Sequence, residues 1–247
     1  MGRKYANPPL IEALCEFQFE PDTKWDATVL GLVYERVRGQ FPTRRPARQY
    51  SVSISPGPEG VKPTVQATER MQFLREDGVA MVQVGPHLLA VNHLKPYPSW
   101  ERFLPLIHEG LKAYTDVASP TSIRRIGLRY INRIVIPSAR IDPQDYFDLY
   151  PYVGPGLPQL RGPFMVGVQF PYAQSRDGLK LELISADSDR PDSSTLILNL
   201  DYFVAQPGAV ALDRVAEWIE SAHSHVEEAF EATIKDRLRQ LFEEASA

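Results

Sequence analysis

The chain has 247 residues, of which 27 are basic and 31 acidic, so its formal net charge is -4. Its hydrophobic content of 43% and charged content of 23% are those of an ordinary globular protein, which excludes collagen, a coiled coil and bulk disorder. We expect residues 1–247 to form a single full-length unit with a sizeable core.

The single cysteine, Cys15, indicates the compartment of the protein. One thiol excludes a disulfide framework and any multi-cysteine metal site, and it suits a reducing compartment such as the cytoplasm. The basic start is followed by Pro8, Pro9 and Glu12, which do not fit a signal peptide. The longest uncharged run, from Gly78 to Leu94, is too short and too polar for a membrane helix. The sequence therefore predicts a cytoplasmic protein without membrane association.

The first half is predicted to contain a strand, a helix, an antiparallel meander and a closing helix. Alternating apolar residues predict a strand over 10–20, and helical spacing predicts a helix over 25–38 that Asp22 or Thr23 caps. After the meander, Ser99 is placed to cap the closing helix. Turn residues separate the four predicted meander strands, which are 49–55, 64–75, 79–85 and 88–94.

The second half is predicted to repeat this order. It begins with a strand over 123–136 and a short helix over 142–148. It ends with one helix over 212–242, whose apolar stripe should lie across a sheet. Three strands are predicted in between, over 163–173, 178–187 and 194–204.

These elements predict an α+β fold, with antiparallel sheets, packed helices and a long C-terminal helix. The two halves, 1–119 and 120–247, share the order strand, helix, meander, helix. We interpret this as a degenerate internal duplication of element order, since the residues themselves show no repeat.

Several kinds of chemistry lack their sequence signals. There is no glycine-rich phosphate loop and no Gly-x-Ser-x-Gly motif. His223 and His225 diverge on a helix, so they cannot bind one metal together, and His223 is expected to be half-buried and bonded to a group such as Glu227. We therefore predict no catalytic constellation, metal site or cofactor.

A row of arginines is the first candidate site. Arg125, Arg129 and Arg133 share one face of the 123–136 strand, and such a row can bind phosphates or carboxylates. The alternative is pairing within the protein, because Glu12 and Glu16 have the same spacing on the first strand.

A basic segment is the second candidate, with five arginines and no acidic residue from 36 through 58. It is expected at a helix end and in the following loop, where it is either a solvated surface or a patch for nucleic acid or an acidic partner. Its arginines are Arg36, Arg38, Arg44, Arg45 and Arg48.

The third candidate is the loop 150–163, which contains Tyr150, Tyr152, four prolines and three glycines. Stiff aromatic loops of this length are often binding loops, although a plain connector is the alternative.

Several motifs resemble one sporadically distributed, uncharacterised bacterial family whose members have about the length of this chain. They are Asn7-Pro-Pro-Leu-Ile-Glu-Ala13 near the start, Arg125-Ile-Gly-Leu-Arg-Tyr-Ile-Asn-Arg-Ile134 in the middle, and Ala222-His223 with Phe230 near the end. The resemblance covers nearly the whole chain and implies no established activity. A patchy distribution suggests an accessory role in a mobile or defence system, such as toxin–antitoxin or anti-phage systems. The polar residues on the family pattern are Glu12, Glu16, Asn92, Arg125, Arg129, Tyr130, Asn132, Arg133 and His223.

The sequence thus predicts a non-catalytic binding or complex-forming protein with a protein partner or a homo-oligomeric state. Its arginine row and proline-rich loop would contact an acidic surface or a phosphate-bearing ligand. One alternative is an enzyme whose cleft combines the arginines with His223, and the other is a nucleic-acid-binding protein.

Overall fold

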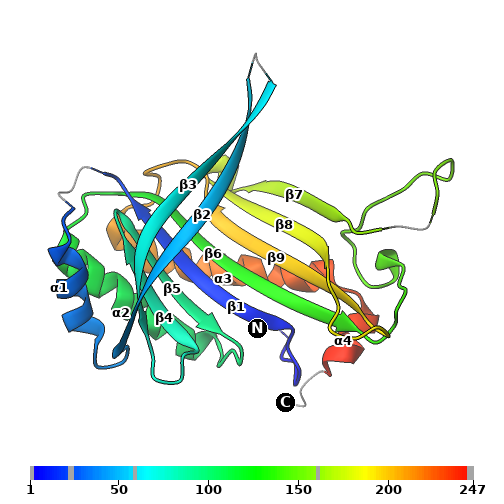
Figure 1. The fold of residues 1–247 in the computed structure, drawn as a ribbon, viewed down its shortest axis with the longest axis horizontal. Helices are drawn as coiled ribbons and strands as arrows, with labels where there is room; N and C mark the ends of the chain where they lie inside the picture. Colours follow the sequence, from blue (N-terminus) through cyan, green and yellow to red (C-terminus); the bar gives the residue numbers. More distant parts are fainter. Residues whose placement is uncertain (1–2, 22–24, 58–59, 160–161, 244–247) are drawn as a thin grey trace. The chain divides into compact units, whose positions relative to one another are not determined.

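The computed structural model describes residues 3–21, 25–57, 60–159 and 162–243, with side chains described outside 49–68. Its main helices are α1 (Thr28–Val37), α2 (Trp100–Ala118), α3 (Val215–Thr233) and α4 (Asp236–Phe242) (Figure 1). Its strands are β1 (Leu10–Phe19), β2 (Thr43–Gly57), β3 (Gly60–Leu74), β4 (Ala80–Gly85), β5 (Leu88–Leu94), β6 (Ile123–Ile136), β7 (Met165–Tyr172), β8 (Asp177–Ala186) and β9 (Ser194–Val204).

The strands follow the hydrogen-bonded order β2-β3-β4-β5-β1-β6-β9-β8-β7. The pairs β2/β3, β3/β4, β4/β5, β6/β9, β7/β8 and β8/β9 are antiparallel. The predicted α+β class with an antiparallel sheet is therefore confirmed. In the described part of the chain, no helix is both long enough and apolar enough to cross a bilayer.

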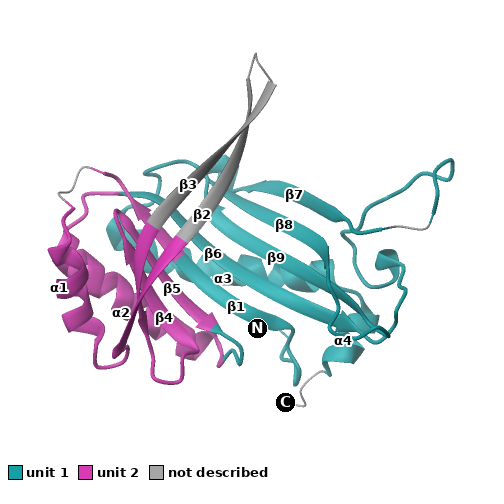
Figure 2. Cartoon of the chain, viewed as in Figure 1, with its two compact units in different colours: residues 1–15, 94–97, 123–247 teal, residues 16–93, 98–122 magenta. Residues whose placement is uncertain are grey.

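The chain divides into two compact units, which Figure 2 shows in teal and magenta. Unit 1 contains residues 1–15, 94–97 and 123–247, and unit 2 contains residues 16–93 and 98–122. Strand β1 contributes its first six residues to unit 1 and its last four to unit 2.

Unit 2 has its core between α1, α2 and its strands. In β1, alternate residues such as Phe17 and Phe19 are fully buried, as the period-two pattern predicted. Helix α1 packs on α2 and buries Val33 and Val37. Tyr114 of α2 stacks on Phe19, with ring centroids 4.7 Å apart.

Unit 1 has a two-layer core in which α3 packs on β6 and β9. Even-numbered residues of both strands, such as Leu128 and Leu198, are buried on the face toward α3. Cys15 is fully buried, as expected for a core residue. The prediction that the C-terminal helix lies across strands is confirmed, because α3 does so.

The prediction of one continuous helix over 212–242 is wrong, because α3 ends at Thr233 and a separate helix, α4, begins at Asp236. Ile234 has an extended conformation, with φ -94° and ψ 150°, and forms a β-bridge with Phe147. The N–H of Lys235 donates to the carbonyl oxygen of Tyr146 at 2.8 Å. The backbone at the break is therefore bonded to a distant loop, while the apolar stripe continues through α4 and gives no sign of the interruption.

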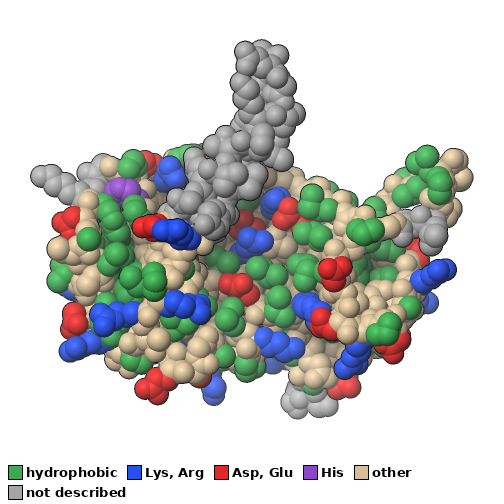
Figure 3. Space-filling view, in the orientation of Figure 1, with side chains coloured by type: hydrophobic (Ala, Val, Ile, Leu, Met, Phe, Trp, Pro, Cys, Tyr) green, Lys and Arg blue, Asp and Glu red, His purple; other side chains and the backbone are tan. Residues whose placement is uncertain are grey.

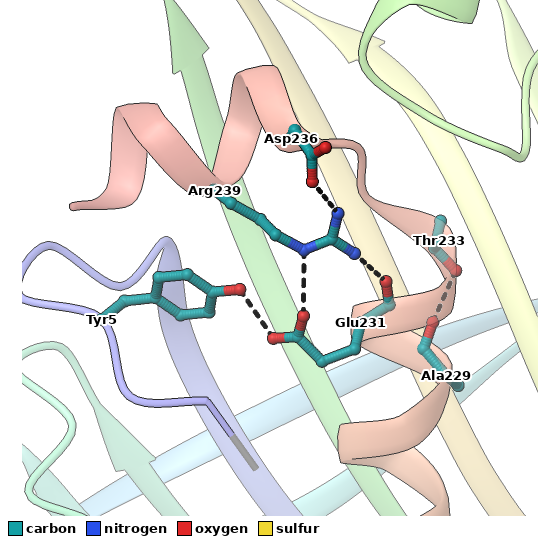
Figure 4. Close-up of polar contacts among 6 residues, drawn as sticks. All are labelled: Tyr5, Ala229, Glu231, Thr233, Asp236 and Arg239. Carbon is teal, nitrogen blue, oxygen red and sulfur yellow. Dashed lines mark hydrogen bonds and ion pairs between the residues drawn. The ribbon is translucent and has the colours of Figure 1, made fainter. Parts of the chain in front are cut away.

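Arg239 of α4 satisfies an end group of α3 at this break (Figure 4). Its Nη2 donates to the carbonyl oxygen of Glu231 at 2.6 Å, and its Nε donates to the Glu231 carboxylate at 3.2 Å. The Tyr5 hydroxyl donates to the other carboxylate oxygen at 2.7 Å. A side chain from the next helix thus caps the last turn of α3.

Two smaller expectations also differ from the structure. The predicted helix over 142–148 is only a 3-10 turn at Pro143–Asp145. Strand β2 begins at Thr43, so part of the basic segment is strand and not loop. Its pairing with β3 sets Arg48 opposite Glu69, and such cross-strand pairs favour the longer strand. The predicted caps at Asp22 and Thr23 lie outside the described residues.

Candidate functional site

The predicted arginine row shares one face of β6, the face of the unit 1 sheet that is turned away from α3. There, Arg125 Nη2 contacts Asp201 Oδ2 at 2.9 Å, and Arg129 Nε donates to Asn199 Oδ1 at 2.6 Å. Arg133 Nη2 contacts an oxygen of Asp189, in the β8–β9 connection, at 2.7 Å. Each arginine therefore has a partner inside unit 1.

The arginine contacts belong to a wider network across β6, β9 and β8. Asn199 Nδ2 donates to Glu182 Oε2, and Lys180 Nζ contacts Glu182 Oε1, both at 2.7 Å. Burial alone would raise the pKa of the Glu182 carboxyl, but the hydrogen bonds from Lys180 and Asn199 outweigh it, and the pKa is lowered. Figure 3 shows acidic and basic side chains interspersed on this face. The face is a network of paired charges, and a single-sign anion site would need unpaired ones.

Of the two glutamates of β1, Glu16 contacts an arginine outside the predicted row. β1 and β6 are neighbours in the strand order, as the alternative interpretation required. Within unit 2, however, Glu16 contacts Arg70 of β3, with Oε2 3.4 Å from Nη2. Glu12 is half-buried in unit 1. The contacts of the arginine row described above come from β9 and the β8–β9 connection.

Tyr130, Asn132 and His223 form a separate group on the face of unit 1 toward α3. The Tyr130 hydroxyl is 3.1 Å from His223 Nδ1 and 3.2 Å from the Tyr97 hydroxyl. Asn132 Nδ2 donates to the carbonyl oxygen of Leu198 at 3.2 Å. This group and the arginine row therefore occupy opposite faces of β6, so His223 and the arginines do not share a cleft.

His223 is in the environment that the sequence predicted. Its side chain is largely buried, and its Nε2 is 3.4 Å from Glu227 Oε1. Burial, with contributions from Tyr97 and Glu227, raises the pKa of the Tyr130 hydroxyl well above its usual value. The neutral phenol and the imidazole thus form a polar contact between β6 and α3.

The basic segment also contacts its surroundings in unit 2. Arg38 pairs with Glu35 at 3.2 Å and Arg48 with Glu69 at 3.1 Å. Arg36 Nη1 donates to the carbonyl oxygen of Leu32 at 3.3 Å. The other two arginines contact neutral groups, Arg44 lying over the Tyr34 ring at 4.8 Å and Arg45 Nε donating to Gln72 Oε1 at 2.9 Å.

The loop 150–163 places its two tyrosines differently. Tyr150 is half-buried, and Lys235 Nζ lies 6.0 Å from the centre of its ring. Tyr152 is 80% exposed, and Leu157 is exposed as well. The outer part of the loop therefore presents apolar groups to solvent.

Strand β7 follows this loop and is the feature whose role sequence reasoning missed. β7 comes last in the strand order, with β8 as its neighbour among the described strands. Met165 is 70% exposed, Phe170 41% and Val168 38%, although the strand contains no charged residue. Val168 lies opposite Leu181 and Phe170 opposite Leu179, so both extend the apolar face toward α3 beyond the sheet's edge.

The absence of charged residues in β7 was the one sequence feature that could have pointed to an unusual strand. The sequence predicted a strand there, but an uncharged strand is equally typical of a buried central position. Only the strand order shows that β7 is at an edge.

No group of acidic, histidine and cysteine side chains among the described residues has a metal-binding arrangement. No protein-family model and no curated protein sequence matches the chain.

Proposed function

We propose that this protein is a non-catalytic, complex-forming protein that binds an extended strand of another protein along β7. The observation that carries the proposal is the exposure of Met165, Val168 and Phe170 on an uncharged edge strand. Proteins usually protect such edges with charges, prolines or covering elements, because an edge strand is a template for pairing. β7 carries no charge, and its one proline, Pro171, is the second-last residue of the strand.

The backbone of β7 supplies one half of this recognition. Its pairing with β8 runs from Met165↔Ile184 to Tyr172↔Asp177, so the outward N–H and C=O groups form a second row, to which Pro171 contributes no N–H. An added strand would pair with that row and cover the half-exposed side chains of Val168 and Phe170. Main-chain bonds then provide affinity, while alternate side chains provide specificity.

The loop 150–163 supplies further side-chain contacts. Its exposed Tyr152 and Leu157 precede β7 in the chain, and tyrosine is enriched among residues that dominate binding energy. The prolines reduce the entropy lost when the loop is ordered by a partner. The net charge of -4 adds only a weak repulsion between copies of this chain, so the test below separates a second protein from a second copy.

The test is capture of the partner from the native host followed by hydrogen exchange on the purified complex. We expect protection of those backbone amides of β7 that do not already bond to β8, Pro171 having none. Val168→Lys with Phe170→Lys should abolish the complex, because charges on an edge oppose strand addition. Val135→Lys is the matched control, since Val135 is 37% exposed on β6, and should leave the complex intact.

Two outcomes would overturn the proposal. One is a stable complex in which the amides of β7 exchange as fast as in the free protein. The other is protection of the same amides in a dimer of this chain alone, which would make a second copy the occupant of the edge.

The proposal extends to the origin and setting of the protein. The sequence resemblance supports an accessory role in a mobile or defence system, and the single Cys15 supports a cytoplasmic location. We also propose an internal duplication, supported by the strand order. In each half, the last meander strand is the neighbour of the opening strand, β5 next to β1 and β9 next to β6.

A further inference from the structure

Unit 2 contains a cavity that the proposed complex does not use. Its volume is about 570 Å³, within the range of small-molecule sites. It lies at the start of α1, the base of the β2–β3 hairpin and the end of β4, and its walls are mostly apolar. Trp25, Leu30, Met71 and Val84 are among the lining residues.

The same cavity is lined by a buried arginine, Arg70. Its side chain is only 8% exposed. Both Nη1 and Nη2 approach one oxygen of Glu16, at 3.5 and 3.4 Å, whereas charge-assisted bonds of this kind are normally about 2.7–2.9 Å. The buried Nε of Arg70 has no hydrogen-bond partner. Arg70 is therefore loosely paired for a cation removed from water.

Glu16 is also shared with another donor. Its second oxygen, Oε1, accepts a hydrogen bond from Gln18 Nε2 at 2.8 Å. Burial lowers the pKa of the Arg70 guanidinium, while Glu16 opposes that effect. An arginine remains protonated in proteins, so a buried and incompletely neutralised positive charge lines the cavity, together with the exposed ion pair between Arg48 and Glu69.

Gly85 permits the end of β4 to approach this arginine closely. A Cβ atom there would lie 3.2 Å from the carbonyl oxygen of Glu69 and 3.3 Å from Cγ of Arg70. The backbone of β4 thus forms one wall of the cavity next to the Arg70 side chain.

We propose that this cavity binds a small organic acid with an apolar body. Its carboxylate pairs with Arg70, and its hydrocarbon part contacts Trp25, Leu30 and Met71. The carboxylate supplies a second anionic partner for the loosely paired guanidinium, and the apolar body fills space that water occupies poorly. The inference concerns unit 2 alone and does not depend on the proposed complex at β7.

The experiment uses decanoate as the probe and decanol as its uncharged counterpart. We expect calorimetric titration of the full chain to show 1:1 binding of decanoate, with decanol binding at least about tenfold more weakly because it cannot form the ion pair. Arg70→Gln should weaken decanoate binding by a similar factor. Arg45→Gln removes an exposed arginine that does not line the cavity, and it should change nothing.

Ala27→Trp keeps Arg70 and fills the cavity from an exposed lining position. It should abolish decanoate binding while the circular dichroism spectrum and melting temperature stay unchanged. This variant carries the test if Arg70→Gln does not fold. Equal affinity for decanoate and decanol, or full decanoate binding in folded Ala27→Trp, would overturn the proposal.

Discussion

The indole Nε1 of Trp218 donates a hydrogen bond to Oδ1 of Asp177 at 3.2 Å, which fixes helix α3 to the sheet of unit 1. The Asp177 side chain is completely buried. Its other oxygen accepts hydrogen bonds from Tyr202 at 3.1 Å and from Arg176 at 2.6 Å. One carboxylate therefore joins strand β9, the start of β8 and helix α3.

Asp177→Asn is a small chemical change that should nevertheless lower the stability of the protein clearly. The amide keeps the shape but loses the charge and presents an NH₂ group to donors, so one buried group is left unpaired. We expect the free energy of unfolding to fall by about 1–3 kcal/mol in urea titrations. Asp189→Asn removes a carboxylate that is largely exposed, and it should change the value by less than about 0.5 kcal/mol. Equal effects of the two substitutions would contradict this role of Asp177.

Arg239→Lys tests the contact between α4 and the end of α3. Lysine keeps the charge but cannot reach both the carbonyl and the carboxylate of Glu231 in the fork geometry of a guanidinium. We expect a loss of about 1 kcal/mol in the free energy of unfolding and faster hydrogen exchange in the last turn of α3. The control is Arg237→Lys, an exposed ion-pair residue on the same helix. Unchanged exchange in Arg239→Lys would show that the cap is dispensable.

Glu182 should make stability depend on pH in the acid range. Its pKa is lowered in the folded protein from an ordinary value of 4.5. A lowered folded pKa stabilises the protein above the unfolded pKa, and this stabilisation disappears as the pH falls through the folded value. Glu182→Gln should therefore show a smaller loss of melting temperature than the parent below pH 4.5. Parallel curves for the two proteins would refute the assignment.

Tyr114 should make stability depend on pH in the alkaline range. Burial raises the pKa of its hydroxyl from 10.0 to about 12. A raised folded pKa gives stabilisation that is complete below pH 10 and is lost as the pH approaches 12. Tyr114→Phe removes the ionisable group, so its stability should decline less over this interval. Ultraviolet titration should show the same number of tyrosines ionising near pH 10 in the parent and in Tyr114→Phe, and one fewer in the variant would count against burial as the cause.

The arginine row should act on stability and not on partner binding. Arg125→Gln removes the contact with Asp201 and the guanidinium that lies 4.9 Å from the centre of the Phe203 ring. Because the ion pair is partly exposed, we expect a loss of about 1 kcal/mol. The affinity purification used for β7 should recover the same partner with this variant. Loss of the partner without loss of stability would return the arginines to the binding surface.

Periodicity located most elements because it reports which side of an element is buried. β6 and β9 have the predicted bounds, 123–136 and 194–204, since their alternation is regular along the whole strand. The predicted helix over 212–242 was wrong because its apolar stripe continues across Ile234, where bonds to Tyr146 and Phe147 interrupt the helix. Those partners are distant in sequence, so local spacing carries no information about them.

For the candidate site residues, the sequence likewise predicted which face of a strand they occupy but not which residues they contact. The sequence correctly placed Arg125, Arg129 and Arg133 on one face of a strand, because side-chain direction alternates with fixed period. It could not assign their partners, which come from β9 and from the β8–β9 connection. The same applies to Arg70, whose burial and incomplete pairing depend on β1, β3 and the cavity wall.

The sequence by itself determined the α+β class, the faces of the strands and the core position of Cys15, since these follow from local composition and alternation. Only the tertiary structure decided that β7 is an edge, that His223 and the arginines face opposite ways, and that α3 ends at Thr233. These properties depend on which strands become neighbours, and that choice is made by packing between residues far apart in the chain.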